Sequence, residues 1–310
     1  MSNEQAGDRC TGEEKQNVGI DPELRSRLEE RAAFIRIETV NLINIAKNGH
    51  YTSTFSAADL FSALYYHTLQ IDPKRPDWPD RDRFVLSKGH AMVGLYPVLA
   101  DLGYFDRSEL ESYTRMGSAF ADHPDMTKVT GADFSSGSLG HGLAICVGMA
   151  LAARVDGLAY RTWCMTGDGE LAEGQIWEAA MMASQYRLGN LVWLVDKNQM
   201  GLDGYTEDVM NIDPLDAKMR AFGFDVQTID GHDFDEIVDT FDALPETAGE
   251  RPQAIIANTV KGKGIGYMEL NPAFHVGGPT LGDAYEEAMR EIRGDASSPR
   301  QHWPRGKTRL

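Results

Sequence analysis

The sequence contains few cysteines and no long apolar run. Its three cysteines, Cys10, Cys146 and Cys164, show no metal-type spacing, and no secretory leader precedes the first helical pattern. We therefore expect reduced thiols and a cytoplasmic location. No apolar stretch reaches the roughly 18 residues that a membrane span requires. The longest, from Leu143 to Ala153, is better explained as a buried helix.

Positive charge is also scarce. The 310 residues include 30 lysines and arginines against 47 aspartates and glutamates, which gives a formal net charge of −17. Nucleic acids and anionic membrane surfaces both require a basic face that this composition does not supply. We therefore expect no nucleic-acid or membrane partner. An anionic ligand would need a metal ion or backbone N–H groups to bind here.

The organisation along the chain indicates one main domain. We expect a flexible polar leader over residues 1–20, a single α/β domain over residues 21–293, and a flexible tail over residues 294–310. Apolar residues recur at helical spacing from Glu23 to Ala46. Ser56-Ala-Ala-Asp59 then has the spacing of a capping box, which predicts the start of a second helix.

The second half alternates strands and helices, which is the pattern of a parallel sheet covered on both faces. We therefore expect a doubly wound, mainly parallel α/β fold. Including one short strand upstream, the predicted strands are 84–87, 162–165, 191–195, 224–229 and 254–257. The predicted helices are 23–46, 56–69, 90–102, 108–115, 175–186, 216–222, 234–244 and 285–292.

Glycine-rich and polar segments follow two neighbouring strands. Gly167-Asp168-Gly169 comes after the strand that includes Met165, and Asp196-Lys197-Asn198 comes after the next strand. In a doubly wound sheet both segments lie at the carboxyl edge, where ligands usually bind. Glycine lets backbone amides approach a phosphate, while Asp168 and Asn198 offer the hard oxygen ligands that Mg²⁺ or Ca²⁺ prefers. Together the segments predict a metal and diphosphate site, although a Gly-Asp-Gly turn alone is commonly structural.

Further segments extend this pattern over about residues 20 to 280. They are Asn48-Gly-His50, Leu86-Ser-Lys-Gly-His90, His123-Pro-Asp125, Ser136-Gly-Ser-Leu-Gly-His-Gly142, and Lys261-Gly-Lys-Gly264 followed by Asn271-Pro and His275. The Gly-Asp-Gly and Asp-Lys-Asn segments, with Trp177-Glu-Ala179 between them, resemble the signature of thiamine-diphosphate enzymes. In identity and order the whole set resembles the N-terminal half of transketolase.

The resemblance implies which residues hold the metal and the cofactor. The implied metal ligands are Asp168, Asn198 and the backbone carbonyl of Met200. The residues implied to contact thiamine diphosphate are His90, Gly137, Leu139, Gly169, Asn198 and His275. Among these, the Gly169 amide would bind the diphosphate, and Gly137 and Leu139 would line the thiazolium side.

Four histidines are implied to take part in catalysis. They are His50, His90, His123 and His275. In the resembled family, His50 and His123 would face the donor ketose, hydrogen-bond to it and carry protons to and from its hydroxyl and carbonyl groups. Imidazole suits this task because its unperturbed pKa of about 6.5 lets it give or take a proton near neutrality. A lone histidine in a turn is more often a buried hydrogen-bonding residue, and that alternative stays open.

Several positions depart from the pattern usual in the family, most of them on the substrate side. Tyr51-Thr52-Ser53 stands where Pro-Gly is usual, residues 131–136 replace the usual Thr-Gly, and His141 stands where glutamine is common. These differences suggest a specialised donor or acceptor. By the same resemblance, Glu173 and Glu178 would lie at a subunit interface; otherwise they are a helix-capping and a solvated residue.

The implied activity is the transfer of a two-carbon ketol unit from a ketose to an aldehyde, both small sugars or sugar phosphates. Such catalysis also needs a pyrimidine-binding domain, which we expect a partner chain to supply. That partner would be a C-terminal transketolase subunit in a heterotetramer with two copies of each chain. Two alternatives stay open. The chain could belong to another thiamine-diphosphate enzyme, such as the α-subunit of a 2-oxo acid dehydrogenase or an acyloin-type synthase, or it could be a non-enzymatic half-site that regulates a partner.

Overall fold

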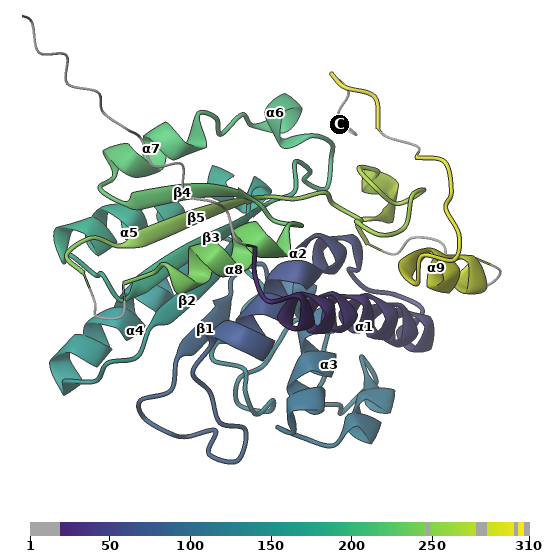
Figure 1. Ribbon diagram of the computed structural model, residues 1–310, viewed down its shortest axis with the longest axis horizontal. Helices are drawn as coiled ribbons and strands as arrows, with labels where there is room; N and C mark the ends of the chain where they lie inside the picture. The colour runs from purple at the N-terminus through teal and green to yellow at the C-terminus, as the bar shows by residue number, and fades with distance from the viewer. Residues whose placement is uncertain (1–18, 246–248, 277–283, 301–302, 307–310) are drawn as a thin grey trace, which may run out of the picture.

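A parallel β-sheet forms the centre of the protein. The computed structural model describes residues 19–245, 249–276, 284–300 and 303–306. The strands are β1 (Arg83–Leu86), β2 (Thr162–Gly167), β3 (Leu191–Lys197), β4 (Asp225–Asp230) and β5 (Gln253–Asn258). They lie in the order β1-β2-β3-β5-β4 (Figure 1), and every neighbouring pair is parallel. The five predicted strands are therefore confirmed, with small differences at their ends.

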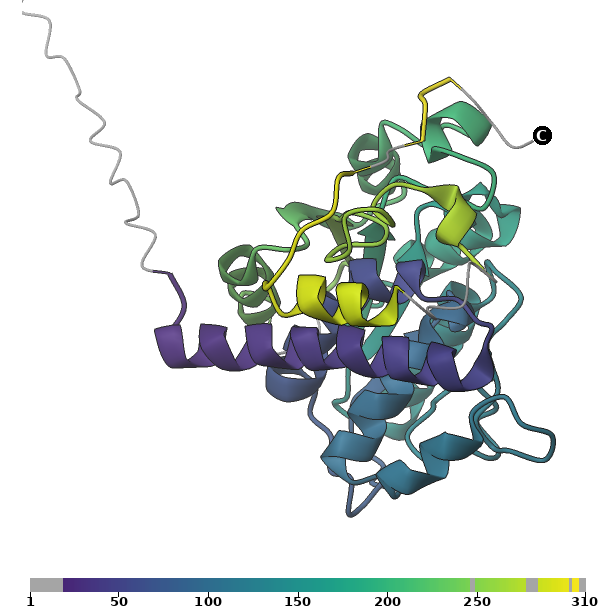
Figure 2. The same cartoon turned by 90° about the vertical axis from the view of Figure 1, so that its right-hand side faces the viewer.

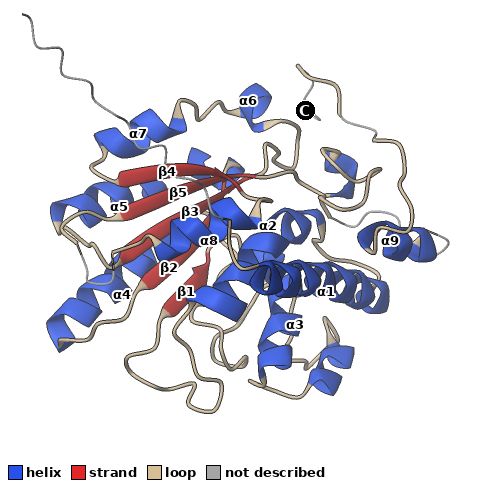
Figure 3. Ribbon diagram, viewed as in Figure 1, coloured by secondary structure: helices blue, strands red, loops and turns tan. Residues whose placement is uncertain are grey.

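Helices cover both faces of the sheet (Figure 3). One hydrophobic core joins the sheet to α1 (Pro22–Ala46), α2 (Thr52–Ala63), α3 (Met92–Leu102) and α8 (Phe234–Asp242). A second core joins the opposite face to α4 (Gly142–Asp156), α5 (Gly174–Gln185) and α7 (Leu215–Ala221). In β2, Trp163 and Met165 enter the first core and Cys164 enters the second. Because both faces are covered, the central strands β2, β3 and β5 are largely buried and mostly apolar, whereas the edge strand β4 is partly polar and exposed.

Shorter elements connect and extend these layers. They are the π-helix η1 (Leu64–Thr68), the 3₁₀ helices η2 (Gly89–Ala91), η3 (Arg107–Ser112), η4 (Gly169–Ala172) and η5 (Pro272–Phe274), and the helices α6 (Thr206–Val209) and α9 (Tyr285–Ile292). Figure 2 shows α9 lying along α1. Its bounds agree with the predicted helix 285–292.

Two helix predictions are wrong. Helix α2 begins at Thr52, so Ser56 lies inside it and caps nothing. The Ser56 hydroxyl instead donates a hydrogen bond of 2.7 Å to the buried carboxylate of Asp196. The segment predicted as helix 108–115 forms the 3₁₀ helix η3, whose capping box is made by Asp106 and Glu109.

The apolar run from Leu143 to Ala153 forms most of α4, but only one side of it is buried. Leu143 and Cys146 are fully buried, whereas Ile145 is 36% exposed. The predicted helix is therefore confirmed, and it is buried along the face that packs on the sheet. No helix in the described parts of the chain combines the length and apolarity needed to cross a membrane.

The chain ends lie partly outside the described residues. Most of the predicted leader, including Cys10, belongs to the residues that are not described, whereas Cys146 and Cys164 are buried free thiols. In the tail, the backbone N–H of Trp303 donates to the carbonyl of Leu270 at 2.9 Å. The flexibility of both ends stays a prediction.

Candidate functional site

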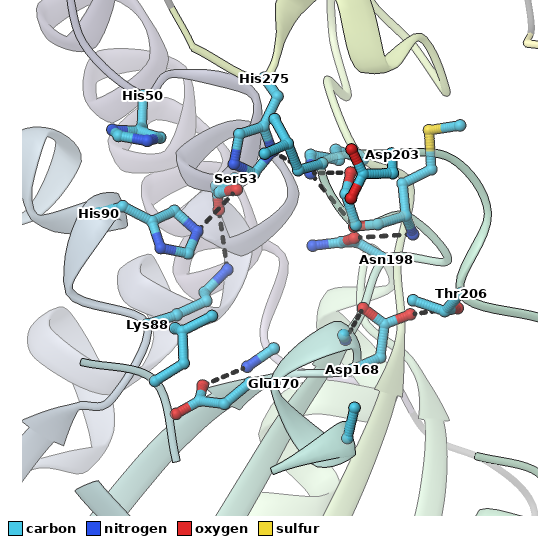
Figure 4. A pocket seen from close by; sticks show the side chains of 18 of the residues that line it. His50, Ser53, Lys88, His90, Asp168, Glu170, Asn198, Asp203, Thr206 and His275 are labelled. Carbon is cyan, nitrogen blue, oxygen red and sulfur yellow. Dashed lines mark hydrogen bonds between the residues drawn. The ribbon is translucent and has the colours of Figure 1, made fainter. Parts of the chain in front are cut away.

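One cavity at the carboxyl edge of the sheet collects the ten residues predicted to bind the metal or the cofactor or to take part in catalysis. Its volume is about 370 Å³. The predicted residues that line it are His50, His90, His123, Gly137, Leu139, Asp168, Gly169, Asn198, Met200 and His275. Figure 4 shows His50 and His90 on one side of this space and Asp168 and Asn198 on the other. The predicted meeting of these segments is confirmed, while their individual roles stay predictions.

The three predicted metal ligands lie at the ends of β2 and β3. Asp168 follows β2, and its carboxylate accepts hydrogen bonds from the backbone N–H groups of Gly169 and Gln199 at 2.9 and 2.8 Å. Asn198 follows β3, and its Oδ1 accepts the N–H of Met200 at 3.2 Å. These local bonds fix the positions of the side-chain oxygens. Among the described residues, no group of three or more His, Cys, Asp or Glu side chains could hold a metal, so amide, carbonyl and phosphate oxygens would have to complete a site here.

The electrostatic state of Asp168 fits a cation. Its side chain is only 1% exposed, and in the described structure it forms no ion pair. Burial, followed by the nearby charge of Asp196, raises the pKa of Asp168 to about 6. A divalent cation beside this carboxylate would offset the cost of burying its charge. The residues present therefore fit a metal that bridges the protein to an anion.

Lys261 is a buried cation to which the sequence interpretation assigned no role. It follows β5 and is 1% exposed. Its Nζ donates to the carbonyl oxygens of Met200 and Gly201, both at 3.1 Å, and lies 2.6 Å from Nδ1 of His275. Burial lowers the pKa of Lys261 to about 7. The signal in the sequence was a lysine followed by glycine directly after an apolar strand.

Lys88 is a second buried cation that was quoted within a motif but given no role. Its side chain, 1% exposed, forms an ion pair with the fully buried Asp196, and its Nζ donates to the carbonyl of Ser53 at 2.8 Å. Although burial opposes ionisation of Asp196, the charge of Lys88 keeps the pKa of that carboxyl lowered. Lys88 thus brings positive charge to the cavity wall, and Asp196 holds the lysine in place.

Glu170 fixes the glycine-rich loop that carries Gly137 and Leu139. Its carboxylate accepts the N–H of Gly140 at 2.8 Å and the hydroxyl of Ser87. Gly140 itself has φ +84°, and a Cβ there would come within 2.7 Å of the Cβ of Glu173. Glycine is therefore required at this position, both for its backbone conformation and for space.

The four predicted histidines form a cluster around His50. The ring centroid of His50 lies 5.2 Å from that of His90, 5.7 Å from His123 and 5.4 Å from His275. Burial, followed by the charge of Lys88, lowers the pKa of His90 well below its ordinary value. Burial also lowers the pKa of His123. Both shifts favour the neutral form of these two rings near pH 7.

The departures from the usual family pattern differ in how they relate to the cavity. Ser53 lines it, and its hydroxyl lies 3.1 Å from Nε2 of His90. His141 lies outside it and is exposed, and its Nδ1 lies 3.1 Å from the carbonyl oxygen of Leu139. Glu173 and Glu178 are exposed on either side of the start of α5, and the Glu173 side chain forms no capping hydrogen bond. The changed segment at residues 51–53 therefore reaches the site, whereas the change at His141 does not.

Comparison with known proteins agrees with this site. The family model for the transketolase, thiamine diphosphate binding domain matches residues 28–301. The 6-deoxy-6-sulfo-D-fructose transketolase subunit SqwG of Clostridium sp. (strain MSTE9) is 44% identical over 248 residues, covering 80% of this chain and 90% of that protein. A subunit of the apulose-4-phosphate transketolase of Phocaeicola vulgatus is 39% identical over 265 residues, covering 86% of this chain and 93% of that protein.

A solved structure shows how this chain relates to a longer transketolase. The transketolase from Campylobacter jejuni subsp. jejuni superposes with a TM-score of 0.80 at 30% identity. The match covers 92% of this chain but only 45% of that protein, so this chain spans less than half of its length. It does, however, span nearly the whole length of the two transketolase subunits described before it. The resemblance seen in the sequence is thus confirmed, and the chain belongs to the transketolase family, in which it corresponds to the N-terminal, thiamine-diphosphate-binding part.

Proposed function

We propose that this chain is the metal- and diphosphate-binding subunit of a split transketolase. Together with a pyrimidine-binding partner subunit, it transfers a two-carbon ketol unit from a ketose to an aldehyde. One observation carries this proposal. The three residues predicted to ligate a metal, two buried lysines and four histidine rings line the same cavity of about 370 Å³. The oxygens and lysines suit a metal-linked diphosphate, and the histidines suit the hydroxyl groups of a sugar.

The binding half of the site has a direct physical interpretation. Asp168, Asn198 and the Met200 carbonyl would ligate Mg²⁺ or Ca²⁺, which are hard cations that prefer oxygen. Lys261 and Lys88 add positive charge to a protein whose net charge is −17. Buried cations act on an anion more strongly than exposed ones, because little water screens them. Thiamine diphosphate, when bound, supplies the carbon nucleophile for ketol transfer.

The histidine half would handle the substrate. His50 and His123 would hydrogen-bond to the hydroxyl groups of the donor and exchange protons with them, while His90 and His275 would contact the diphosphate side. The lowered pKa of His123 supports this assignment, because a neutral ring can accept a proton. The sugar or sugar-phosphate class of the substrates is supported by the names of the relatives, which refer to 6-deoxy-6-sulfo-D-fructose and to apulose 4-phosphate.

The existence of a partner is supported by the relatives, which are named as subunits. Exposed apolar side chains on α4 and α5 are candidates for contact with such a partner. Ile145 on α4 is 36% exposed, and Met181 and Met182 on α5 are 55% and 43% exposed. These helices follow the glycine-rich loop and the Gly-Asp-Gly segment, so a partner docked on them would lie beside the cavity. We propose a heterotetramer with two copies of each chain.

The test is to co-express this chain with the protein encoded beside it and to assay the purified complex with thiamine diphosphate and Mg²⁺. The donor panel should include 6-deoxy-6-sulfo-D-fructose and apulose 4-phosphate. Ketol transfer that requires both chains, and that is lost in His50→Gln but kept in His141→Gln, is the expected result. A complex that only decarboxylates 2-oxo acids, or that has no activity, would refute the proposal.

A further inference from the structure

His50 is paired with a carboxylate that the sequence interpretation did not consider. Nδ1 of His50 lies 2.7 Å from Oδ2 of Asp122, a residue 72 positions away in the chain. The two side chains are 18% and 27% exposed, so water only partly screens the contact. Because a carboxylate can only accept a hydrogen bond, Nδ1 must be the nitrogen that carries the proton. Nε2 of His50 has no hydrogen-bonding partner among the described residues.

The other carboxylate oxygen of Asp122 accepts a second hydrogen bond. The hydroxyl of Tyr113, a fully buried residue, donates to Oδ1 of Asp122 at 3.1 Å. The neighbouring His123 is farther away, with Nδ1 3.6 Å from the carboxylate, beyond hydrogen-bonding distance. The Asp122 carboxylate is therefore the hydrogen-bonding partner of His50, and Tyr113 fixes the orientation of that carboxylate.

The loop that carries His50 is shaped to reach this carboxylate. Gly49 has φ +140°, and a Cβ at that position would lie 2.4 Å from a side-chain carbon of Ile43 and 3.4 Å from Oδ1 of Asp122. The positive φ disfavours any other residue at this position, and a side chain would also press against Ile43. Glycine therefore permits the backbone conformation in which the next residue, His50, reaches Asp122.

The charged and titratable neighbours favour an ionised Asp122. Burial opposes its ionisation, but the hydrogen bond from His50 and the nearby charges outweigh it, and the pKa of Asp122 is lowered. His50 also faces His90, His123 and His275. Their rings supply no other acceptor that lies within hydrogen-bonding distance of Nδ1.

We propose that Asp122 is a positioning residue that holds His50 in the Nδ1–H tautomer, so that Nε2 is free to accept a proton from a hydroxyl group of the ketose. This inference rests on the proposed function, because it assigns His50 a substrate. When the carbon–carbon bond of the donor breaks, the O–H bond of the adjacent hydroxyl also breaks. The proton passes to Nε2, the electron pair of the O–H bond forms the carbonyl of the departing aldehyde, and the pair of the carbon–carbon bond stays with the two-carbon unit. The imidazolium that results is stabilised by Asp122 through Nδ1–H, as in other Asp–His pairs.

The decisive variant is Asp122→Asn, which preserves the shape of the side chain. The asparagine amide can donate a hydrogen bond to Nδ1, so the preferred tautomer of His50 should change to Nε2–H, and Nε2 would no longer accept a proton. The matched control is Asp242→Asn, because Asp242 forms a similar pair with His67 outside the cavity, at 2.9 Å. Tyr113→Phe is a milder test, since it removes only the hydrogen bond from the Tyr113 hydroxyl to Asp122.

Two measurements test the inference. The first is the ¹⁵N spectrum of the full chain labelled at histidine, recorded above pH 8, with the His50 signals assigned through His50→Gln. The expected result is an Nδ1–H signature for His50 in the wild type and in Asp242→Asn, and its loss in Asp122→Asn. The second is turnover by the complex, where Asp122→Asn should lower kcat by about 10²- to 10⁴-fold with little change in KM, whereas Tyr113→Phe should lower it only several-fold.

Either of two results would overturn the inference. One is an Nε2–H tautomer of His50 in the wild type, and the other is an Asp122→Asn variant that keeps both the Nδ1–H signature and the wild-type kcat. The tautomer measurement needs no turnover. It therefore decides the role of Asp122 even if the complex fails to transfer ketol units, a failure that would count against the proposed function alone.

Discussion

Nζ of Lys261 lies 2.6 Å from Nδ1 of His275 and 3.1 Å from the carbonyl oxygen of Met200. The same buried amino group thus contacts a residue implied to bind the diphosphate and a residue implied to bind the metal. In the structure it joins the two parts of the site that the sequence interpretation treated separately. The charge of Lys261 should therefore matter for cofactor affinity more than its place in a glycine-rich segment suggests.

Replacing this lysine should weaken cofactor binding. We expect Lys261→Met to raise the Kd for thiamine diphosphate by about 10- to 100-fold, because a hydrogen bond from a charged group contributes about 1.5–3 kcal/mol. Isothermal titration of the assembled complex in the presence of Mg²⁺ measures the change. Lys263→Met is the control, since Lys263 lies in the same segment but does not line the cavity. Equal affinities of the two variants for thiamine diphosphate would show that Lys261 does not contribute to cofactor binding.

Removing the carboxylate at the end of β2 should abolish the dependence of binding on metal. We expect Asp168→Asn, and likewise Asn198→Ala, to weaken Mg²⁺-dependent cofactor binding by at least about 100-fold, since the first removes the negative charge and the second the amide oxygen of a residue predicted to ligate the metal. Titration of the complex with and without a chelator shows the effect. Asp216→Asn, which changes an exposed carboxylate on α7, serves as the control. Unchanged metal dependence in Asp168→Asn would place the metal elsewhere.

The state of His90 predicts a pH dependence of stability. Its folded pKa is held well below its ordinary value by burial and by Lys88. The unfolded chain therefore binds a proton below about pH 6.5 that the folded chain does not, so the free energy of unfolding falls as the pH drops. Between about pH 7.5 and pH 5.5 the free energy of unfolding should fall in both proteins. We expect the fall to be about 1 kcal/mol smaller in His90→Gln than in the wild type.

Urea denaturation at a series of pH values measures this difference. His141→Gln provides the control for losing a histidine, because the His141 ring is exposed to solvent. Parallel stability curves for the wild type and His90→Gln would contradict the assignment of a neutral, buried His90.

The apolar surface of α4 and α5 should bind the partner. Met182 is 43% exposed on α5, and a charge there would have to be buried on association. We expect Met182→Glu to weaken the complex by at least about tenfold, and cofactor affinity to fall with it because half of the pocket is lost. Met116→Glu is the control, since Met116 is fully exposed in a loop far along the chain from these helices. Co-purification of Met182→Glu at wild-type stoichiometry would exclude this surface.

Local sequence was sufficient to predict those site residues that directly follow a strand of the sheet. Asp168 and Asn198 each come directly after a strand, and parallel neighbouring strands end at the same edge of a sheet. Their meeting could therefore be predicted without coordinates. Apolar runs likewise located the central strands, because strands buried on both faces are mostly apolar. The capping box at Ser56 failed because the hydroxyl found a tertiary partner, Asp196, that no local pattern contains.

The amino-acid sequence by itself determined the parallel sheet and the placement of Asp168 and Asn198 at its edge, since each depends on residue type and on position relative to a strand end. The set of histidines was named through the family resemblance. Tertiary structure alone decided which side chains pair. Lys88 meets Asp196 across 108 residues, and His50 meets Asp122 across 72. Such pairings depend on how separate loops fold over the edge of the sheet. Burial then makes each pair energetically important, because a charge removed from water must find a partner.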